Sequence, residues 1–153
     1  MTDPAEPEWA GPIYLDASAL IKLFVPEPES DALNDALVGS EDVVVSDLAL
    51  TEMASALGRR VRETLVPAAE ARRLLRAAAG LASAARRAEL TPPTHRRAER
   101  ILLTSRHMTL RALDALHIAL ALGSGAATLV SFDRRLASAA AAHHLFVAPG
   151  AMR

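Results

Sequence analysis

Residues 13–16, with the sequence IYLD, constrain the fold more than any other part of the chain, because three apolar residues run directly into an aspartate. A Gly-Pro pair precedes this run and a helix-forming segment follows it. A short apolar run between turn residues is typical of a buried parallel strand. We therefore expect a strand that places Asp16 at the carboxyl edge of a sheet, where ligands bind in open α/β folds. The structural alternative is that Asp16 or Ser18 only caps the next helix.

The same pattern recurs near the end of the chain. Residues 128–131 form a second short, mostly apolar run, and Asp133 follows it at the start of another helical segment. Two strands that each deliver an aspartate to the same edge of a sheet predict a constellation of acids rather than two unrelated helix caps.

Strand-like runs alternate with helical patterns along the chain. The expected strands cover residues 13–16, 43–45, 89–91, 128–131 and 145–147. The expected helices cover residues 17–25, 29–38, 47–63, 67–87, 94–107, 111–122 and 133–142, and the third and fourth of these form a helical hairpin. Such alternation predicts the α/β class, with a parallel sheet of four to five strands covered by helices on both faces.

A chain of 153 residues fits a single domain. We expect it to cover residues 13–148, between an acidic, Pro-rich tail at 1–12 and a short tail at 149–153. The absence of cysteine excludes a disulfide framework and a thiolate metal site. The sequence has no apolar run of about 18 residues and no leader-like start, so we expect no membrane segment and a cytoplasmic location.

Charge is distributed unevenly along the sequence. Residues 1–52 carry twelve acidic residues and one basic residue, Lys22, whereas residues 53–153 carry six acidic residues and sixteen arginines. Arginine favours bidentate contacts with phosphate. Solvated helix faces are nevertheless the expected role for most of these arginines.

The helix expected at 111–122 contains a third acid in an unusual setting. Between its second and last residues, only Asp114 and His117 are polar, which is typical of a buried helix. A buried carboxylate is costly unless it is paired or binds a metal. An ion pair with Arg111 is the structural alternative for Asp114. A buried, hydrogen-bonded side chain is the expectation for His117, with a metal ligand as the alternative.

Glu52 is the fourth candidate, because it lies beside the buried stripe of the helix expected at 47–63. Taken alone, it would be expected to be solvated. Four converging carboxylates without cysteine favour a hard cation such as Mg²⁺ or Mn²⁺. Such a cation activates water for in-line attack on phosphate, which suits hydrolysis of a phosphodiester bond.

Taken in order, four segments resemble the motifs of the PIN-domain family and, more closely, those of the VapC toxins of bacterial toxin–antitoxin modules. They are DASALIK at 16–22, LTEMASAL at 50–57, LDALHIA at 113–119 and SFDRRL at 131–136. The resemblance implies an α/β/α sandwich with strand order 3-2-1-4-5 and a Mg²⁺- or Mn²⁺-dependent endoribonuclease that acts on RNA. It further implies a VapB-type antitoxin as partner and a homodimer.

By position, the resemblance implies a set of acids with metal-binding and catalytic roles: Asp16, Glu52, Asp114 and Asp133. Ser18 and Ser131 match the hydroxyl neighbours of this set. Arg134 and Arg135, beside Asp133, could meet RNA phosphates.

Three alternative functions compete with this interpretation. One is a PIN-domain nuclease in RNA processing outside a toxin–antitoxin pair, and another is a catalytically inactive PIN-like binding module. A phosphatase of the haloacid dehalogenase type is disfavoured, because it needs a second acid two residues after the first and Ser18 occupies that position.

Overall fold

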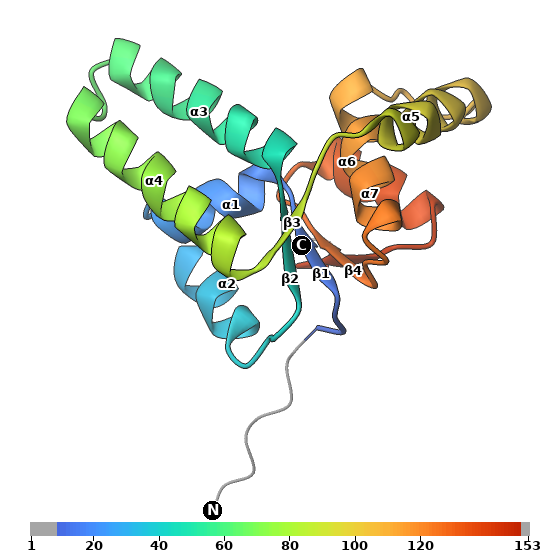
Figure 1. Cartoon of the computed structure of the whole chain (residues 1–153), viewed down its shortest axis with the longest axis horizontal. Helices are drawn as coiled ribbons and strands as arrows, with labels where there is room; N and C mark the ends of the chain where they lie inside the picture. The colour runs from blue at the N-terminus through green and yellow to red at the C-terminus, as the bar shows by residue number, and fades with distance from the viewer. Residues whose placement is uncertain (1–8, 151–153) are drawn as a thin grey trace, which may run out of the picture.

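The computed structural model describes residues 9–150, which form a parallel sheet with helices on both faces (Figure 1). The strands are β1 (Ile13–Leu15), β2 (Val43–Ser46), β3 (Arg86–Ala88), β4 (Thr128–Val130) and β5 (Phe146–Ala148). Their order is β3-β2-β1-β4-β5, and every neighbouring pair is parallel. The predicted α/β class and strand order are confirmed.

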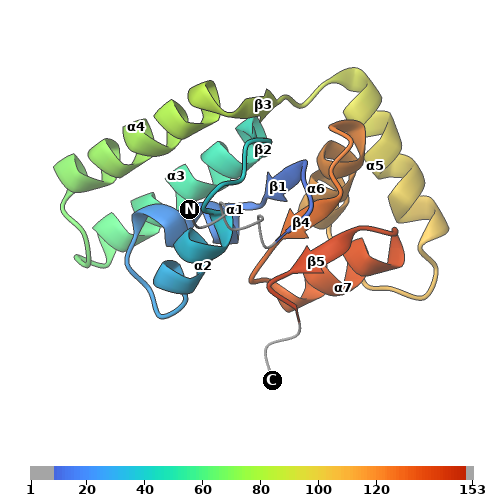
Figure 2. The same ribbon diagram turned by 90° about the horizontal axis from the view of Figure 1, so that it is seen from below.

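Helices make up the outer layers of the described chain. They are α1 (Ala17–Phe24), α2 (Ser30–Leu37), α3 (Asp47–Arg62), α4 (Ala68–Ala84), α5 (Pro92–Thr104), α6 (Ala112–Gly123) and α7 (Arg134–Ala142). Helices α3 and α4 form the predicted hairpin, which extends to one side of the sheet (Figures 1 and 2).

The two faces of the sheet bury separate sets of side chains, because successive strand residues point to opposite faces. Ile13 and Leu15 of β1 pack in one apolar cluster with residues of α1 to α4. Tyr14, between them, packs in the other cluster with residues of α5 to α7. Burial on both faces explains why the central strands read as continuous apolar runs.

The strand register positions the polar residues that follow the central strands. Leu15 of β1 pairs with Val45 on one side and with Val130 on the other. The residue that follows each of these three is polar, so Asp16 lies between Ser46 and Ser131 at the carboxyl edge of the sheet.

Strand β3 differs from the sequence prediction. A strand was expected at 89–91, but the structure has it at Arg86–Ala88, and the preceding helix ends at Ala84 rather than near residue 87. β3 is an edge strand whose two arginines are exposed. It therefore lacks the apolar run by which buried strands are found, and the Ala- and Arg-rich helical pattern continues into it without a stop signal.

The two chain ends lie largely outside the described residues, which exclude 1–8 and 151–153. The predicted division into tails and a domain at 13–148 therefore stays a prediction. Within the expected tail, Trp9 packs in the core and the Ala10 carbonyl accepts a hydrogen bond from the Thr128 hydroxyl at 2.7 Å.

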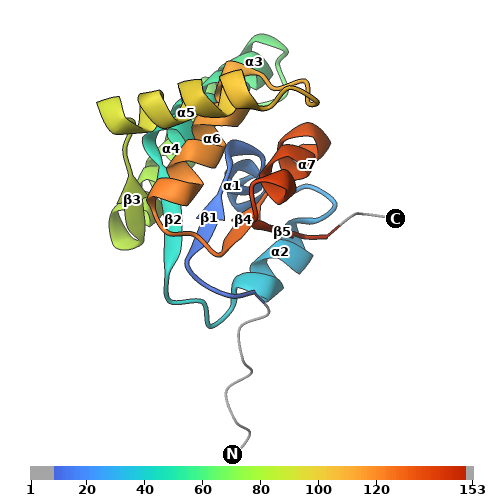
Figure 3. The same ribbon diagram turned by 90° about the vertical axis from the view of Figure 1, so that its right-hand side faces the viewer.

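At the opposite edge of the sheet from β3, β5 lies beside α7 (Figure 3).

Over residues 9–150, no helix has the length and apolar character needed to cross a membrane.

Candidate active site

Asp16 is the most enclosed acid of the site, with 3% of its surface exposed. Its carboxylate accepts hydrogen bonds from the backbone N–H of Ala19 at 2.9 Å, the Ser18 hydroxyl at 2.6 Å and the Ser131 hydroxyl at 2.5 Å. The bond from Ala19 makes Asp16 the N-cap of α1, so it has the structural role that was the alternative. The two hydroxyl contacts go beyond that role.

Burial raises the pKa of Asp16 above its ordinary value, although the hydrogen bonds from Ser131 and Ser18 act in the opposite direction. The three donors are all neutral, and no cationic side chain within residues 9–150 lies within 4 Å of this carboxylate. The site thus holds a fixed, buried carboxylate that lacks a counter-charge in direct contact.

The two serines also connect neighbouring loops. The Ser18 hydroxyl accepts a hydrogen bond from the Phe132 N–H at 2.9 Å, and the Ser131 hydroxyl accepts one from the Asp133 N–H at 3.0 Å. Asp16, Ser18 and Ser131 are therefore brought together, with the backbone of Asp133 beside them. The Asp133 side chain is exposed and caps α7.

Glu52 reaches the site from the second turn of α3 and contacts His117 of α6. The other ring nitrogen of His117, Nδ1, lies 2.7 Å from the Tyr14 hydroxyl, and that hydroxyl donates to Ser46 at 2.9 Å. The expectation that His117 is buried and hydrogen-bonded is confirmed. Its contact with Glu52 could not be read from the sequence, because the two residues are 65 positions apart.

Burial raises the pKa of the Tyr14 hydroxyl well above its ordinary value, so Tyr14 stays protonated. It can then serve as a fixed donor or acceptor inside the sheet. The chain of contacts from Ser46 through Tyr14 and His117 holds the Glu52 carboxylate at the edge of the site.

Asp114 lies in the first turn of α6 and is 6% exposed. Its carboxylate accepts the backbone N–H of Arg111 at 3.1 Å and lies 3.7 Å from the Nε of Arg135. The alternative of an ion pair with Arg111 is therefore wrong about the partner, because the nearby cation is Arg135. The Nε of Arg135 is buried and has no hydrogen-bond partner in the described structure.

Each of three acids has its own contact partners in the structure. Asp16 contacts the serines, Glu52 contacts His117, and Asp114 lies near Arg135. Within residues 9–150, no group of three or more His, Cys, Asp or Glu side chains is placed to hold a metal ion. The donors fit a hard cation in chemical type, since all four candidates offer carboxylate oxygens and buried Asp16 has no cationic side chain within 4 Å among residues 9–150. Their assignment as metal ligands stays a prediction.

A hollow of about 350 Å³ opens beside Glu52, between α3 and the start of α6. It is lined by Glu52, Ser55, Ala56, Arg59, Arg62 and Leu113. Arg59 and Arg62 were not singled out from the sequence. Their spacing of seven and ten residues from Glu52 places all three on one helix face, and this periodicity was the available signal.

Arg134 has a different environment from its neighbour Arg135. It is exposed and lines another hollow, of about 480 Å³, together with Ser131 and Asp133. Arg135 turns toward Asp114 instead. The expectation that Arg134 and Arg135 meet RNA phosphates stays a prediction.

Comparison with known proteins shows which family the chain belongs to. The PIN domain family matches residues 13–142, which is most of the chain, and the chain therefore belongs to the PIN domain family. Within it, the chain is 37% identical to Ribonuclease VapC46 of Mycobacterium tuberculosis (strain ATCC 25618 / H37Rv) over 140 residues, which is 84% of this chain and 89% of that protein. The resemblance to VapC ribonucleases that the sequence motifs indicated is confirmed.

Solved structures agree on the fold. The crystal structure of Mycobacterium tuberculosis VapC20, described as a Sarcin-Ricin loop cleaving toxin, matches with a TM-score of 0.66 at 21% identity and covers 83% of this chain and 94% of that one. VapBC2 from Rickettsia felis, bound to a DNA fragment from their promoter, matches with a TM-score of 0.60 at 15% identity and covers 88% of this chain and 96% of that one.

Proposed function

We propose that this chain is the ribonuclease toxin of a toxin–antitoxin module and hydrolyses RNA phosphodiester bonds at the carboxyl edge of its sheet. The observation that carries the proposal is Asp16, a buried carboxylate oriented by two hydroxyls and without a cationic side chain within 4 Å among residues 9–150. The similarity to a protein named as a ribonuclease supports the choice of RNA as substrate.

Asp16 would hold a Mg²⁺ or Mn²⁺ ion, together with some or all of Glu52, Asp114 and Asp133. When bound, such an ion supplies an activated water and neutralises charge on the phosphate. Ser18 and Ser131 keep the Asp16 carboxylate in one orientation.

Other residues of the chain position these acids and the substrate. His117 fixes Glu52 through a direct contact. Arg59 and Arg62 line the hollow beside Glu52, where their guanidinium groups can meet phosphate oxygens. Arg135 lies near Asp114 and offsets part of the negative charge of the site.

The test is RNA cleavage with Mn²⁺ or with chelator, using the wild-type protein and Asp16→Asn. Because a metal contributes several kcal/mol to such reactions, we expect chelator or the substitution to slow cleavage by about 100-fold or more. Asp31→Asn is the matched control, since Asp31 is an exposed acid in the first turn of α2 and belongs to neither proposed binding region. Cleavage that survives both chelator and Asp16→Asn would contradict the proposed site.

The proposed inhibitor is a VapB-type antitoxin, and the VapBC2 complex among the structural neighbours supports a partner of this kind. We propose that an antitoxin Arg or Lys enters near Asp16 and Asp114, where its charge would compensate the carboxylates. Apolar antitoxin residues would pack on the α3–α4 hairpin, whose tip exposes Leu65.

Replacing that basic residue of the antitoxin by Ala should relieve inhibition strongly, because desolvated charge pairs at interfaces couple by about 1.5–7 kcal/mol. Full inhibition by the Ala variant would show that the antitoxin blocks RNA access elsewhere. A small reading frame next to that of this chain would identify the antitoxin and disfavour a role in RNA processing outside a toxin–antitoxin pair.

A homodimer is also proposed, on the resemblance to VapC toxins. Light scattering of the purified chain measures the mass directly. The remaining alternative, an inactive PIN-like binding module, predicts no RNA cleavage by the wild-type protein with any divalent cation.

A further inference from the structure

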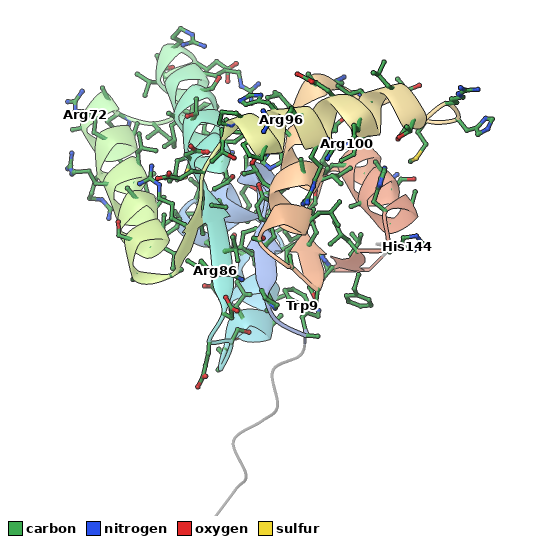
Figure 4. The ribbon with its side chains drawn as sticks, turned by 45° about the vertical axis from the view of Figure 1, so that its right-hand side comes forward. Trp9, Arg72, Arg86, Arg96, Arg100 and His144 are labelled. Carbon is green, nitrogen blue, oxygen red and sulfur yellow. The ribbon has the colours of Figure 1, made fainter. Side chains whose placement is uncertain are left out.

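A cavity of about 500 Å³ lies between β3 and the helices α5 and α6, and five arginines line it. They are Arg86, Arg87, Arg96, Arg97 and Arg100. Figure 4 shows Arg86 by β3 and Arg96 and Arg100 on α5, whereas Arg72 lies on α4, in the α3–α4 hairpin. The single acidic residue among the lining residues is Glu89.

Two of the five arginines have structural partners. Arg86 pairs with Asp42 and donates to the Ser124 carbonyl at 2.8 Å. The Arg97 guanidinium lies against Gly123 at the end of α6, where a basic group stabilises the helix dipole.

The remaining three, Arg87, Arg96 and Arg100, are exposed and have no carboxylate within 4 Å among residues 9–150. Like-charged guanidinium groups gathered around one cavity repel each other, and their repulsion is relieved when an anion binds. The structure therefore keeps an excess of positive charge in a concave site.

Two helices, α3 and α6, each extend from the neighbourhood of the cavity and carry a residue of the acidic site. The backbone N–H of Leu90, beside the cavity, donates to Asp47 at 3.1 Å, and Asp47 is the first residue of α3, which carries Glu52. Helix α6 carries Asp114 in its first turn and ends at Gly123 in the cavity wall. At about 1.5 Å per residue, these two positions are roughly 13 Å apart along the helix.

We propose that the arginine cavity binds the phosphodiester backbone of the RNA substrate at a distance from the bond that is cut. This inference rests on the proposed function. Arginine forks match phosphate oxygens bidentately, and the hydroxyls of Thr91 and Thr94 add further donors. The apolar wall, which includes Val44 and Leu120, can accept a sugar or a base edge. An acidic protein segment is the competing occupant.

The test compares two double variants that each remove two exposed arginines spaced four residues apart on a helix. The double variant Arg96→Ala with Arg100→Ala removes two guanidinium groups from the cavity. The double variant Arg72→Ala with Arg76→Ala on α4 is the matched control. Binding of a fluorescein-labelled single-stranded RNA is followed by anisotropy at several salt concentrations, with chelator present so that no cleavage occurs.

We expect the cavity variant to raise the Kd roughly tenfold and to lower the slope of log Kd against log salt by about 1 for each phosphate that the protein no longer binds. The control variant should change both values little. Cleavage of a dinucleotide, which is too short to reach the cavity, should be the same in both variants and in the wild-type protein.

Equal RNA affinity in the cavity variant and the control would overturn the inference, whatever the cleavage assays give. Unchanged RNA affinity with weakened antitoxin binding would assign the cavity to an acidic protein segment instead. If the wild-type protein cleaves no RNA, the proposed function fails, whereas the anisotropy measurement still reports on the cavity.

Discussion

The acidic edge of the sheet and the arginine cavity differ in how far their charged side chains are exposed to solvent. Asp16, Asp114 and His117 are 3–6% exposed and are held by hydrogen bonds from the sheet and its helices. Arg96 and Arg100 of the cavity are exposed. The carboxylates of Asp16 and Asp114 are therefore part of the folded interior, and changing them should affect stability as well as activity. The cavity arginines belong to the surface, and changing them should affect binding more than folding.

The position of each region in the sheet explains this difference. The acids follow β1 and β4 or lie on helices packed against them, and these strands are covered on both faces. The cavity borders β3, an edge strand of three residues with exposed side chains. Predictions that test the comparison therefore pair a change at the acidic edge with a change near the cavity.

The largest effect on stability is expected from Tyr14→Phe. This change leaves Ser46 and His117 without their shared hydroxyl partner inside the protein. We expect the free energy of unfolding to fall by about 1–3 kcal/mol, because buried polar groups lose their hydrogen bonds. Urea unfolding measures the loss, and Arg87→Ala near the cavity is the control, with an expected change below about 0.5 kcal/mol. Similar losses in both variants would remove the distinction between the two regions.

A smaller effect is expected at Asp16, and its sign should depend on the substitution. Asp16→Ala removes the N-cap of α1 and should lower the free energy of unfolding by about 0.5–2 kcal/mol. Asp16→Asn keeps an oxygen that can accept from Ala19 and removes a buried charge, so it should be as stable as the wild-type protein or more stable. Thermal unfolding in chelator at neutral pH compares the three proteins. A clear loss in Asp16→Asn would mean that the charge itself stabilises the fold.

The pH dependence of stability should reveal the same carboxyl group. Its pKa is raised in the folded protein, so the folded state binds the proton more tightly than the unfolded state. The stability that this proton contributes is complete below the ordinary pKa of 3.8 and is lost as the pH rises through the folded value. The stability of Asp16→Asn relative to the wild-type protein should therefore increase over this range, as measured by urea unfolding in chelator. A constant difference would contradict the raised pKa.

The smallest effect is expected from Arg86→Ala at the cavity. Arg86 and Asp42 form an ion pair at 3.2 Å, and the two side chains are 44% and 50% exposed. Such a pair contributes between 0 and about 1 kcal/mol, and added salt weakens it. Urea unfolding at low and high salt tests both points. A salt-independent loss as large as that of Tyr14→Phe would show that the edge strand depends on this arginine.

The sequence predicted the central part of the fold because the buried strands differ so clearly from their surroundings. Ile13 to Leu15 are apolar without interruption and end on Asp16, and the structure has a strand and a helix cap at these positions. The same reasoning failed at β3, where Arg86 and Arg87 face solvent and carry no apolar signal.

Contacts between distant segments could not be predicted in the same way. Glu52 meets His117, and Arg135 lies near Asp114, only after α3, α6 and α7 have packed around the sheet. A single sequence gives the helix face of each residue but not the helix that it will meet. The arginine cavity has the same origin, since its residues come from β3, α5 and the adjoining end of α6.

The two arginines of β3 also bear on how the chain associates with copies of itself. An edge strand offers unpaired backbone N–H and C=O groups to any other extended chain, and charged side chains on that strand discourage such pairing. A second copy that approached along β3 would bring arginines against arginines. The opposite edge, β5, exposes Phe146 and lacks this protection. Over the described residues, charged side chains therefore protect β3 but not β5, and we expect any strand addition to begin at β5.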